Sequence, residues 1–314
     1  MIQNYLTNFL FTFIGVCTLV APIPLRSQEL KIFTLKDFDL KGTVKSCLVI
    51  TDYGKEEFDF NEAGFLTKSV TRYNDSDYDI TYYKYSNGDV IEKRLENYRD
   101  NVFDKSTSIA NIYEIDTTAN KKILEKIYSY NEDFLDQYEY QYDSEGKLIK
   151  IRRTNNDGID ETHIEYVTYK GETTKTYFLN EVIQQSVRDS KRKTRNKGVQ
   201  RIHLTKKFLE GQPDKAIEKI YSANDKLIKE QRFVYDGKEK SFVIQSVITN
   251  TYNDKGMLSK VKTKTGDLEE TKEYIYQYDN GEEGNWIKQI ITPENAYTTR
   301  KITYYEVEEA EKQK

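Results

Sequence analysis

The chain has 314 residues, a formal net charge of −4 and a hydrophobic content of 37%, which is low for a thick two-sided core. Tyrosine occurs 26 times and proline only four times, a composition that favours strands. We therefore expect a single twisted sheet, with Tyr, Leu and Ile on one face and Lys, Glu, Thr and Asn on the other.

The first 25 residues carry no charged side chain and contain an apolar run at 9–20. That run is too short for a comfortable membrane span of ~20 residues. It predicts a signal peptide over residues 1–27, cleaved between Ser27 and Gln28, and an uncleaved anchor is the alternative. The exported protein is then expected in the periplasm, on the outer surface or secreted, with membrane contact only through this segment.

Removal of the signal leaves residues 28–314, which we interpret as one sheet domain whose only cysteine is Cys47. A single thiol excludes an internal disulfide, so stability must come from the sheet itself. We expect a strand over residues 42–50 and interpret Cys47 as a half-buried strand residue rather than a reactive thiol.

Three aspartates, Asp75, Asp77 and Asp79, alternate along the chain as calcium ligands can. No glycine or closing glutamate follows at the spacing of a calcium loop. The segment is therefore interpreted as a solvated turn, and no metal site is predicted. Residues 98–120 and 154–162 lack clear alternation and are expected to be irregular.

Residues 138–153 have the pattern of a complete β-hairpin. Tyr138, Tyr140 and Tyr142 alternate with polar residues, as in a strand with one aromatic face. The turn Asp143–Gly146 begins with aspartate and ends with glycine, which is typical of a three-residue hairpin loop. The chain is expected to reverse direction here.

The loop length decides the register of this hairpin. A three-residue loop pairs Tyr142 with Leu148, whereas a two-residue loop would pair it with Ile149. Close relatives of this heptad keep an aromatic residue first and leucine seventh, which favours Leu148. They lie at residues 60–66, 221–227 and 252–258, with looser copies at 85–90 and 278–286.

These tandem Y-D-x-x-G-x-L units resemble the YD repeats of the Rhs-type family of bacterial surface and secreted proteins, from about Phe58 to the C-terminus. The resemblance implies β-hairpins strung into one sheet, often at a cell surface and often without an activity of their own. Because the units are few and irregularly spaced, we expect an all-β fold of antiparallel hairpin repeats forming an extended, twisted or curled meander sheet rather than a closed shell.

The C-terminal hairpins, residues 273–314, are expected to cap the sheet, because the last repeat of an array has no neighbour to cover it. Trp286 occupies the leucine position of the heptad. We expect the strand at residues 297–305 to cover it, and a sugar-stacking tryptophan is the alternative.

Residues 190–207 contain eight Lys or Arg and no acidic residue. We interpret this segment as a solvated loop, or alternatively as a contact for an anionic polymer. Export and the absence of interleaved aromatic residues argue against nucleic acid. The residues proposed for such a contact are Lys191, Arg192, Lys193, Arg195 and Lys197.

The sequence offers little for catalysis. His163 and His203 are the only histidines, and neither has the spacing of a metalloprotease motif. No nucleophile elbow, phosphate loop or paired-cysteine motif is present. We therefore predict a protein that is not an enzyme and needs no cofactor, with a hydrolase as the less favoured reading.

Two functional hypotheses follow. The first is a non-catalytic exported envelope or cell-surface protein whose repeat sheet is a scaffold for another envelope protein. The second is a carbohydrate-binding surface protein that stacks sugars on exposed rings. The residues proposed for stacking are Tyr138, Tyr140, Tyr142, Tyr276 and Trp286.

Overall fold

The computed structural model describes residues 31–195, 198–279 and 284–306. The described residues from Ile32 onward form one compact unit. The predicted signal peptide lies outside the described residues. None of the described residues belongs to a helix that is long and apolar enough to cross a membrane.

The described residues form twenty strands and one short 3₁₀ helix, η1(Leu35–Phe38). In chain order the strands are β1(Val44–Thr51), β2(Gly54–Phe60), β3(Leu66–Arg72), β4(Tyr78–Ser86), β5(Asp89–Arg99), β6(Val102–Asp116), β7(Lys122–Ser129), β8(Phe134–Tyr142), β9(Leu148–Asn155), β10(Gly158–Tyr169), β11(Glu172–Leu179), β12(Val182–Thr194), β13(Gly198–Leu209), β14(Gln212–Tyr221), β15(Leu227–Asp236), β16(Ser241–Tyr252), β17(Leu258–Thr265), β18(Leu268–Tyr278), β19(Trp286–Thr292) and β20(Ala296–Tyr304). The all-β prediction is confirmed. The expectation of irregular structure at residues 98–120 and 154–162 is wrong, because β6 and the β9–β10 hairpin occupy much of them.

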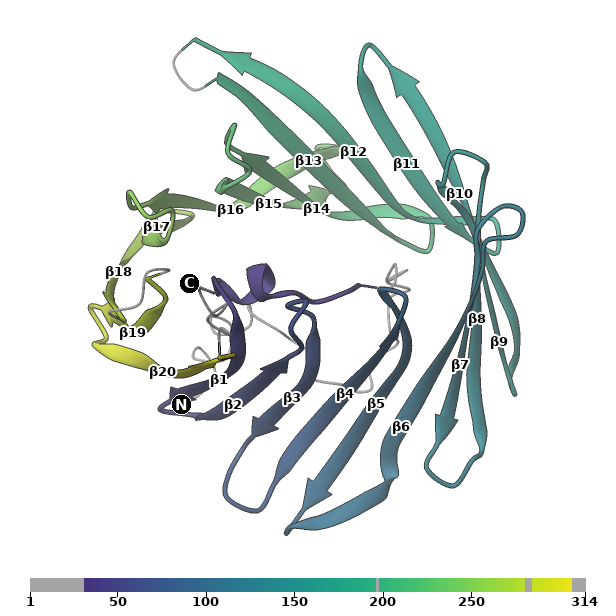
Figure 1. Ribbon diagram of the computed structural model, residues 1–314. Helices are drawn as coiled ribbons and strands as arrows, with labels where there is room; N and C mark the ends of the chain where they lie inside the picture. Colours follow the sequence, from purple (N-terminus) through teal and green to yellow (C-terminus); the bar gives the residue numbers. More distant parts are fainter. Residues whose placement is uncertain (1–30, 196–197, 280–283, 307–314) are drawn as a thin grey trace, which may run out of the picture. The chain divides into compact units, whose positions relative to one another are not determined.

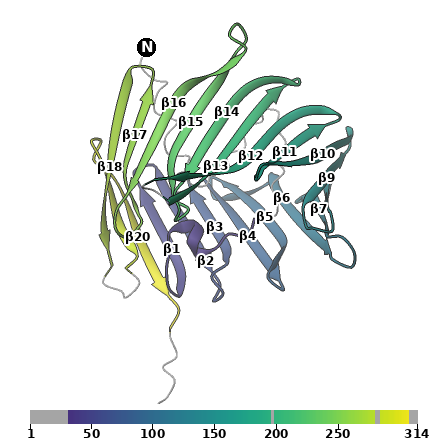
Figure 2. The same ribbon diagram turned by 90° about the horizontal axis from the view of Figure 1, so that it is seen from above.

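Each strand pairs antiparallel with the next, so the sheet is the predicted hairpin meander. The meander does not stay open. Strand β1 also pairs with β20, from Val44 opposite Tyr304 to Ile50 opposite Thr299, and the twenty strands make a closed barrel (Figures 1 and 2). The expectation of an extended or merely curled sheet is thereby corrected. Closure pairs both edges that an open sheet would leave with unsatisfied N–H and C=O groups.

The predicted register of the hairpins is confirmed. Tyr142 lies opposite Leu148, as Tyr252 does opposite Leu258 and Phe60 opposite Leu66. In the first of these loops the backbone N–H of Asp143 donates to Lys147 O at 2.9 Å, and that of Gly146 donates to Asp143 O at 3.0 Å. These bonds close the three-residue loop. The related heptads pair Tyr221 with Leu227 and Tyr278 with Trp286.

Helix η1 lies on the inner side of the ring of strands (Figure 1) and identifies the inner face of the sheet. Its Phe38 ring is 4.6 Å from that of Phe58 and 5.3 Å from that of Phe60, between centroids. Leu40, Cys47 and Leu66 belong to the same buried cluster. Cys47 is 1% exposed, so it is more deeply buried than predicted, because the η1 segment covers the inner face of β1.

The two faces differ as the composition predicts. Along β17 and β18 the inner positions Val261, Tyr274 and Tyr276 are buried or half-buried, whereas the outer positions are exposed. The outer side chains form cross-strand ion pairs, with Lys260 Nζ 2.7 Å from Glu273 Oε1 and Lys262 Nζ 2.7 Å from Glu269 Oε1.

The seam between the two ends of the sheet is the pairing of β1 with β20, and Trp286 of β19 packs beside it. Trp286 is 6% exposed, and the Arg300 guanidinium of β20 stacks 3.4 Å from its ring centroid. Arg300 Nη2 donates to Phe38 O at 3.0 Å. Asn285 is 2% exposed, and its amide both accepts from Lys41 N and donates to Lys41 O, each at 2.9 Å. The predicted covering of Trp286 by the last strand is therefore observed.

The hairpin glycines give a first testable prediction. Gly146 and Gly256 have φ of +77° and +75°, and an added Cβ at Gly146 meets nothing within 4 Å. Gly146→Val and Gly256→Val should each destabilise the protein by at least ~1 kcal/mol through backbone strain alone. The measurement is the midpoint of urea unfolding. Gly237→Val is the matched control, since Gly237 also has open space but no positive φ; equal midpoints for all three variants would contradict the prediction.

Truncation after Ile291 gives a second prediction. It removes β20 and with it both the β19–β20 and the β1–β20 pairings. We expect red-shifted fluorescence of Trp286 and aggregation at low denaturant, because the sheet then has two exposed edges. Truncation after Glu306 keeps all of β20 and should leave both properties unchanged. A truncated chain that stays monomeric with an unshifted Trp286 spectrum would contradict the closing role.

Candidate functional site

A hollow of about 490 Å³ opens on the outer face of β5–β7. Its floor follows from the register, because Arg94 lies opposite Ala110 and Ala110 opposite Tyr128. The small alanine side chain leaves space between the guanidinium and the tyrosine ring. The residues lining the hollow are Arg94, Ala110, Ile112, Tyr128, Ser129, Tyr130 and Glu132.

The outward position of the hollow follows from the pairing ladder. Phe58, which contacts η1, pairs with Ser69, Ser69 with Thr81, and Thr81 with Leu95. Leu95 therefore shares the inner face. Since successive strand residues point to opposite faces, Arg94 points outward.

The Arg94 side chain is held by two carboxylates. Its Nε lies 2.8 Å from Glu92 Oε1, and its Nη1 lies 3.7 Å from Glu96 Oε1. The guanidinium also lies over the Tyr82 ring, 5.2 Å from the centroid. These contacts hold Arg94 in place as one wall of the hollow. The two carboxylates also balance the positive charge of the guanidinium.

Tyr130 lines the hollow next to Arg94, since both side chains meet Glu96 Oε1. Its hydroxyl donates to Glu96 Oε1 at 2.7 Å. Its ring meets that of Phe103 edge-on, with centroids 4.9 Å apart and planes at 70°. Burial, followed by the hydrogen bond and the charge of Glu96, raises the pKa of Tyr130 well above its usual value. The hydroxyl is therefore neutral at physiological pH.

Sequence reasoning missed this site. Its floor comes from β6, in a segment without clear alternation, where the β5–β6 register shifts between Leu95 and Asn97. The Tyr128-Ser129-Tyr130 triplet was a usable signal, since it places two rings within three residues at a strand end.

The tyrosines proposed for sugar stacking lie on the inner face instead. Tyr140 and Tyr142 are each 7% exposed. The hydroxyl of Tyr140 donates to Glu125 Oε2 at 2.8 Å, and Tyr138 is half-buried beside it. Tyr276 accepts a hydrogen bond from Gln289 and packs against Trp286. The proposed residues thus fall into two groups, one on β8 and one on the paired strands β18 and β19. Their rings are largely covered.

The prediction of a solvated loop at residues 190–207 is wrong, because most of this basic segment lies in β12 and β13. The segment also does not form a patch on one face. Lys191, Arg192 and Lys193 are exposed consecutive residues of β12, so the two lysines and the arginine point to opposite faces. Arg192 Nη2 donates to Gln200 Oε1 at 2.9 Å. Arg195 is exposed in the following turn, and Lys197 lies outside the described residues. An anionic-polymer contact at these residues stays a prediction.

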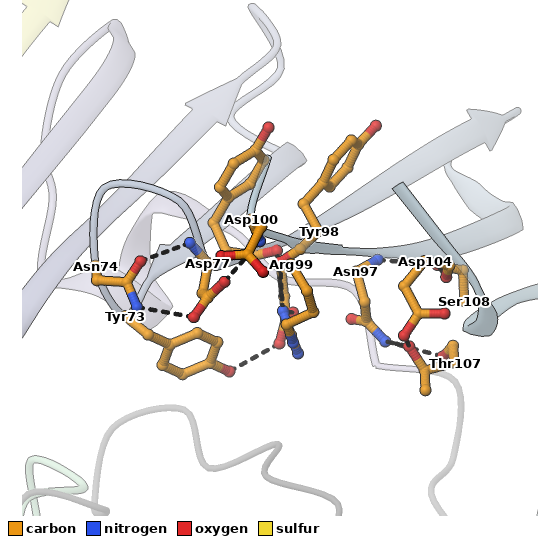
Figure 3. Close-up of polar contacts among 12 residues, drawn as sticks. Tyr73, Asn74, Asp77, Asn97, Tyr98, Arg99, Asp100, Asp104, Thr107 and Ser108 are labelled. Atoms are coloured by element: carbon orange, nitrogen blue, oxygen red, sulfur yellow. Dashed lines mark hydrogen bonds and ion pairs between the residues drawn. The ribbon is translucent and has the colours of Figure 1, made fainter. Parts of the chain in front are cut away.

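Two of the three aspartates near the β3–β4 turn, Asp77 and Asp79, are bonded to neighbouring residues of this chain (Figure 3). Asp77 accepts from Asn74 Nδ2 at 2.8 Å and from Asp100 N at 2.9 Å, and these bonds lower the pKa of its carboxyl group. Asp79 accepts from Tyr73 Oη and Arg99 Nη1. In the described part of the chain, no group of three or more His, Cys, Asp or Glu side chains is placed to hold a metal ion.

The two histidines lie apart on different faces. His163 stacks on Phe178, with centroids 4.7 Å apart, and its ring nitrogens are 3.7 and 3.8 Å from carboxylate oxygens of Glu165 and Glu181. The Glu181 side chain is 90% exposed, so this group is open to solvent. His203 Nδ1 lies 2.8 Å from Asp189 Oδ1.

Comparison with known proteins adds little. No protein-family model and no curated protein matches the chain. Among solved structures it is similar to a porin-like protein from Bacteroides vulgatus ATCC 8482, with 9% identity over 85% of this chain and 100% of that chain and a TM-score of 0.26. A similarity at that score carries no argument about this protein. The resemblance to YD repeats remains a prediction from the sequence.

The Glu96 contact gives a third prediction. Glu96→Gln removes a negative charge that raises the pKa of Tyr130, so that pKa should fall toward the usual value near 10. It is measured by following the Cζ resonance of labelled tyrosines against pH. Glu114→Gln is the control, since Glu114 pairs with Lys126 on the same face. A Tyr130 pKa that is unchanged in Glu96→Gln would contradict the geometry of the hollow.

Proposed function

We propose that the protein is an exported, non-catalytic protein whose closed sheet stands in water and is a scaffold for binding another envelope component. The observation that carries this proposal is the ion-paired outer face of the barrel. The predicted signal peptide supplies the route of export.

The charged outer face extends around the ring. Lys126 Nζ of β7 lies 2.7 Å from Glu114 Oε1 of β6, and Lys150 Nζ of β9 lies 2.6 Å from Glu161 Oε2 of β10. The same kind of pair recurs between β17 and β18. In all three pairs of strands the charged residues lie within the strands themselves rather than in the loops.

A barrel that spans a bilayer needs a different surface. Its outward side chains form an apolar band about 25 Å tall, and a Lys or Arg at the midplane costs roughly 2–4 kcal/mol. Outward charges on three separate pairs of strands are incompatible with such a band. The charged outer face therefore favours an aqueous compartment.

Closure of the sheet limits how a partner can bind. Strand addition needs a free edge, and in the described sheet β1 and β20 pair with each other. A partner therefore has to bind on the outer face or at the hairpin ends. Carbohydrate binding is the second candidate function, and the hollow lined by Tyr128 and Tyr130 favours it.

Partition of residues 28–314 between water and detergent is the fourth prediction and tests the proposed function. The protein should remain in the aqueous phase on Triton X-114 separation, because its outer face is charged. It should also fail to float with phosphatidylcholine–phosphatidylglycerol vesicles. Recovery in the detergent phase, or release of a dye from the vesicles, would contradict the proposal.

A further inference from the structure

We propose that the outer hollow binds a neutral carbohydrate. The ring faces of Tyr128 and Tyr130 pack against the apolar face of a sugar, and Arg94 and Glu132 bond to its hydroxyl groups. This inference rests on the proposed function, because the hollow must open to water rather than to lipid.

The size and lining of the hollow suit a small polar ligand with one apolar face. Its volume of about 490 Å³ falls within the range of roughly 300–1,000 Å³ found for small-molecule sites. Such sites combine aromatic and aliphatic walls with a few polar groups that fix orientation. Here Ala110 and Ile112 form the apolar floor, and Tyr128 and Tyr130 supply the aromatic part of the lining.

The walls of the hollow are pre-organised. The contacts of Tyr130 with Glu96 and Phe103 hold its ring. The Tyr128 ring meets the ring of Phe134 edge-on, with centroids 6.2 Å apart and planes at 72°. Rings held in this way lose little conformational entropy when a ligand binds, which improves affinity.

The charges around the hollow favour a neutral ligand over an anion. Arg94 is balanced by Glu92 and Glu96, and Glu132 adds a further carboxylate at the lining. Three carboxylates against one guanidinium repel a phosphate or an acidic sugar. Sugar hydroxyls can donate to carboxylates and accept from a guanidinium, so a neutral glycan satisfies both.

The same polar groups argue against an acyl chain as the occupant. A lipid tail would cover Arg94 and Glu132 without replacing their hydrogen bonds to water. Each polar group left unpaired in this way costs roughly 1–3 kcal/mol. A carbohydrate covers the same apolar floor without that cost.

The experiment is a screen of residues 28–314 against an array of neutral glycans, followed by calorimetry with the tetrasaccharide that binds best. Tetragalacturonate is the anionic comparison. We expect a neutral glycan to bind at least about tenfold more tightly than tetragalacturonate. Tyr128→Ala should weaken that binding at least about tenfold. Tyr169→Ala, at a tyrosine 67% exposed elsewhere on the chain, should leave it unchanged.

A second variant guards against loss of binding through misfolding. Ala110→Leu fills the floor of the hollow, so it should abolish binding while the melting temperature stays within a few degrees of the wild type. The inference is overturned if no neutral glycan binds at millimolar concentration, if tetragalacturonate binds more tightly, or if Tyr128→Ala binds as the wild type does. A chain that stays in the aqueous phase but binds no glycan would refute this inference alone, whereas recovery in detergent would refute the proposed function.

Discussion

The rest of the structure depends on the pairing of β1 with β20. These strands are separated by almost the whole chain, yet residues 44–50 lie in register with residues 299–304. The pairing brings Arg300 over Trp286 and against Phe38 O of η1. Desolvation in this seam lowers the pKa of Arg300 to about 10, yet the guanidinium stays protonated at neutral pH. Closure thus helps to fix the inner face, because Phe38 of η1 packs beside this pairing, in one buried cluster with Cys47 of β1 and Phe58 of β2.

Closure also gives the two faces different environments. A strand that slipped by one residue would exchange every inner side chain for an outer one. The same register therefore brings about both the outer ion pairs of β17 and β18 and the buried contact of Tyr276 with Trp286. An outer face of this kind is well hydrated in water, which is the environment that we propose for the protein.

The hairpins could be predicted from sequence because their information is local. An aspartate, a glycine and two apolar residues within seven positions set the loop and the Tyr142–Leu148 pair. Closure could not be predicted, since no local pattern relates Val44 to Tyr304. The hollow was missed for a related reason: its floor depends on a register that shifts at Asn97, where Ser108 Oγ accepts from the Asn97 N–H at 2.9 Å. That bond replaces part of the regular β5–β6 ladder. Inner and outer side chains therefore do not alternate regularly along the sequence of β6.

The tyrosines of the two faces differ in what remains for a ligand. On the inner face the Glu125 carboxylate accepts from Asn111 Nδ2, Tyr113 Oη and Tyr140 Oη, at 2.7, 2.9 and 2.8 Å. Burial and then the charge of Glu125 raise the pKa of Tyr113 and Tyr140. Their hydroxyls therefore remain protonated donors, and their rings pack on the inner face of the sheet. On the outer face Tyr130 also gives its hydroxyl to a carboxylate, but it stands at the rim of an open hollow. The same residue type therefore stabilises the barrel on one side and leaves an aromatic surface open to water on the other.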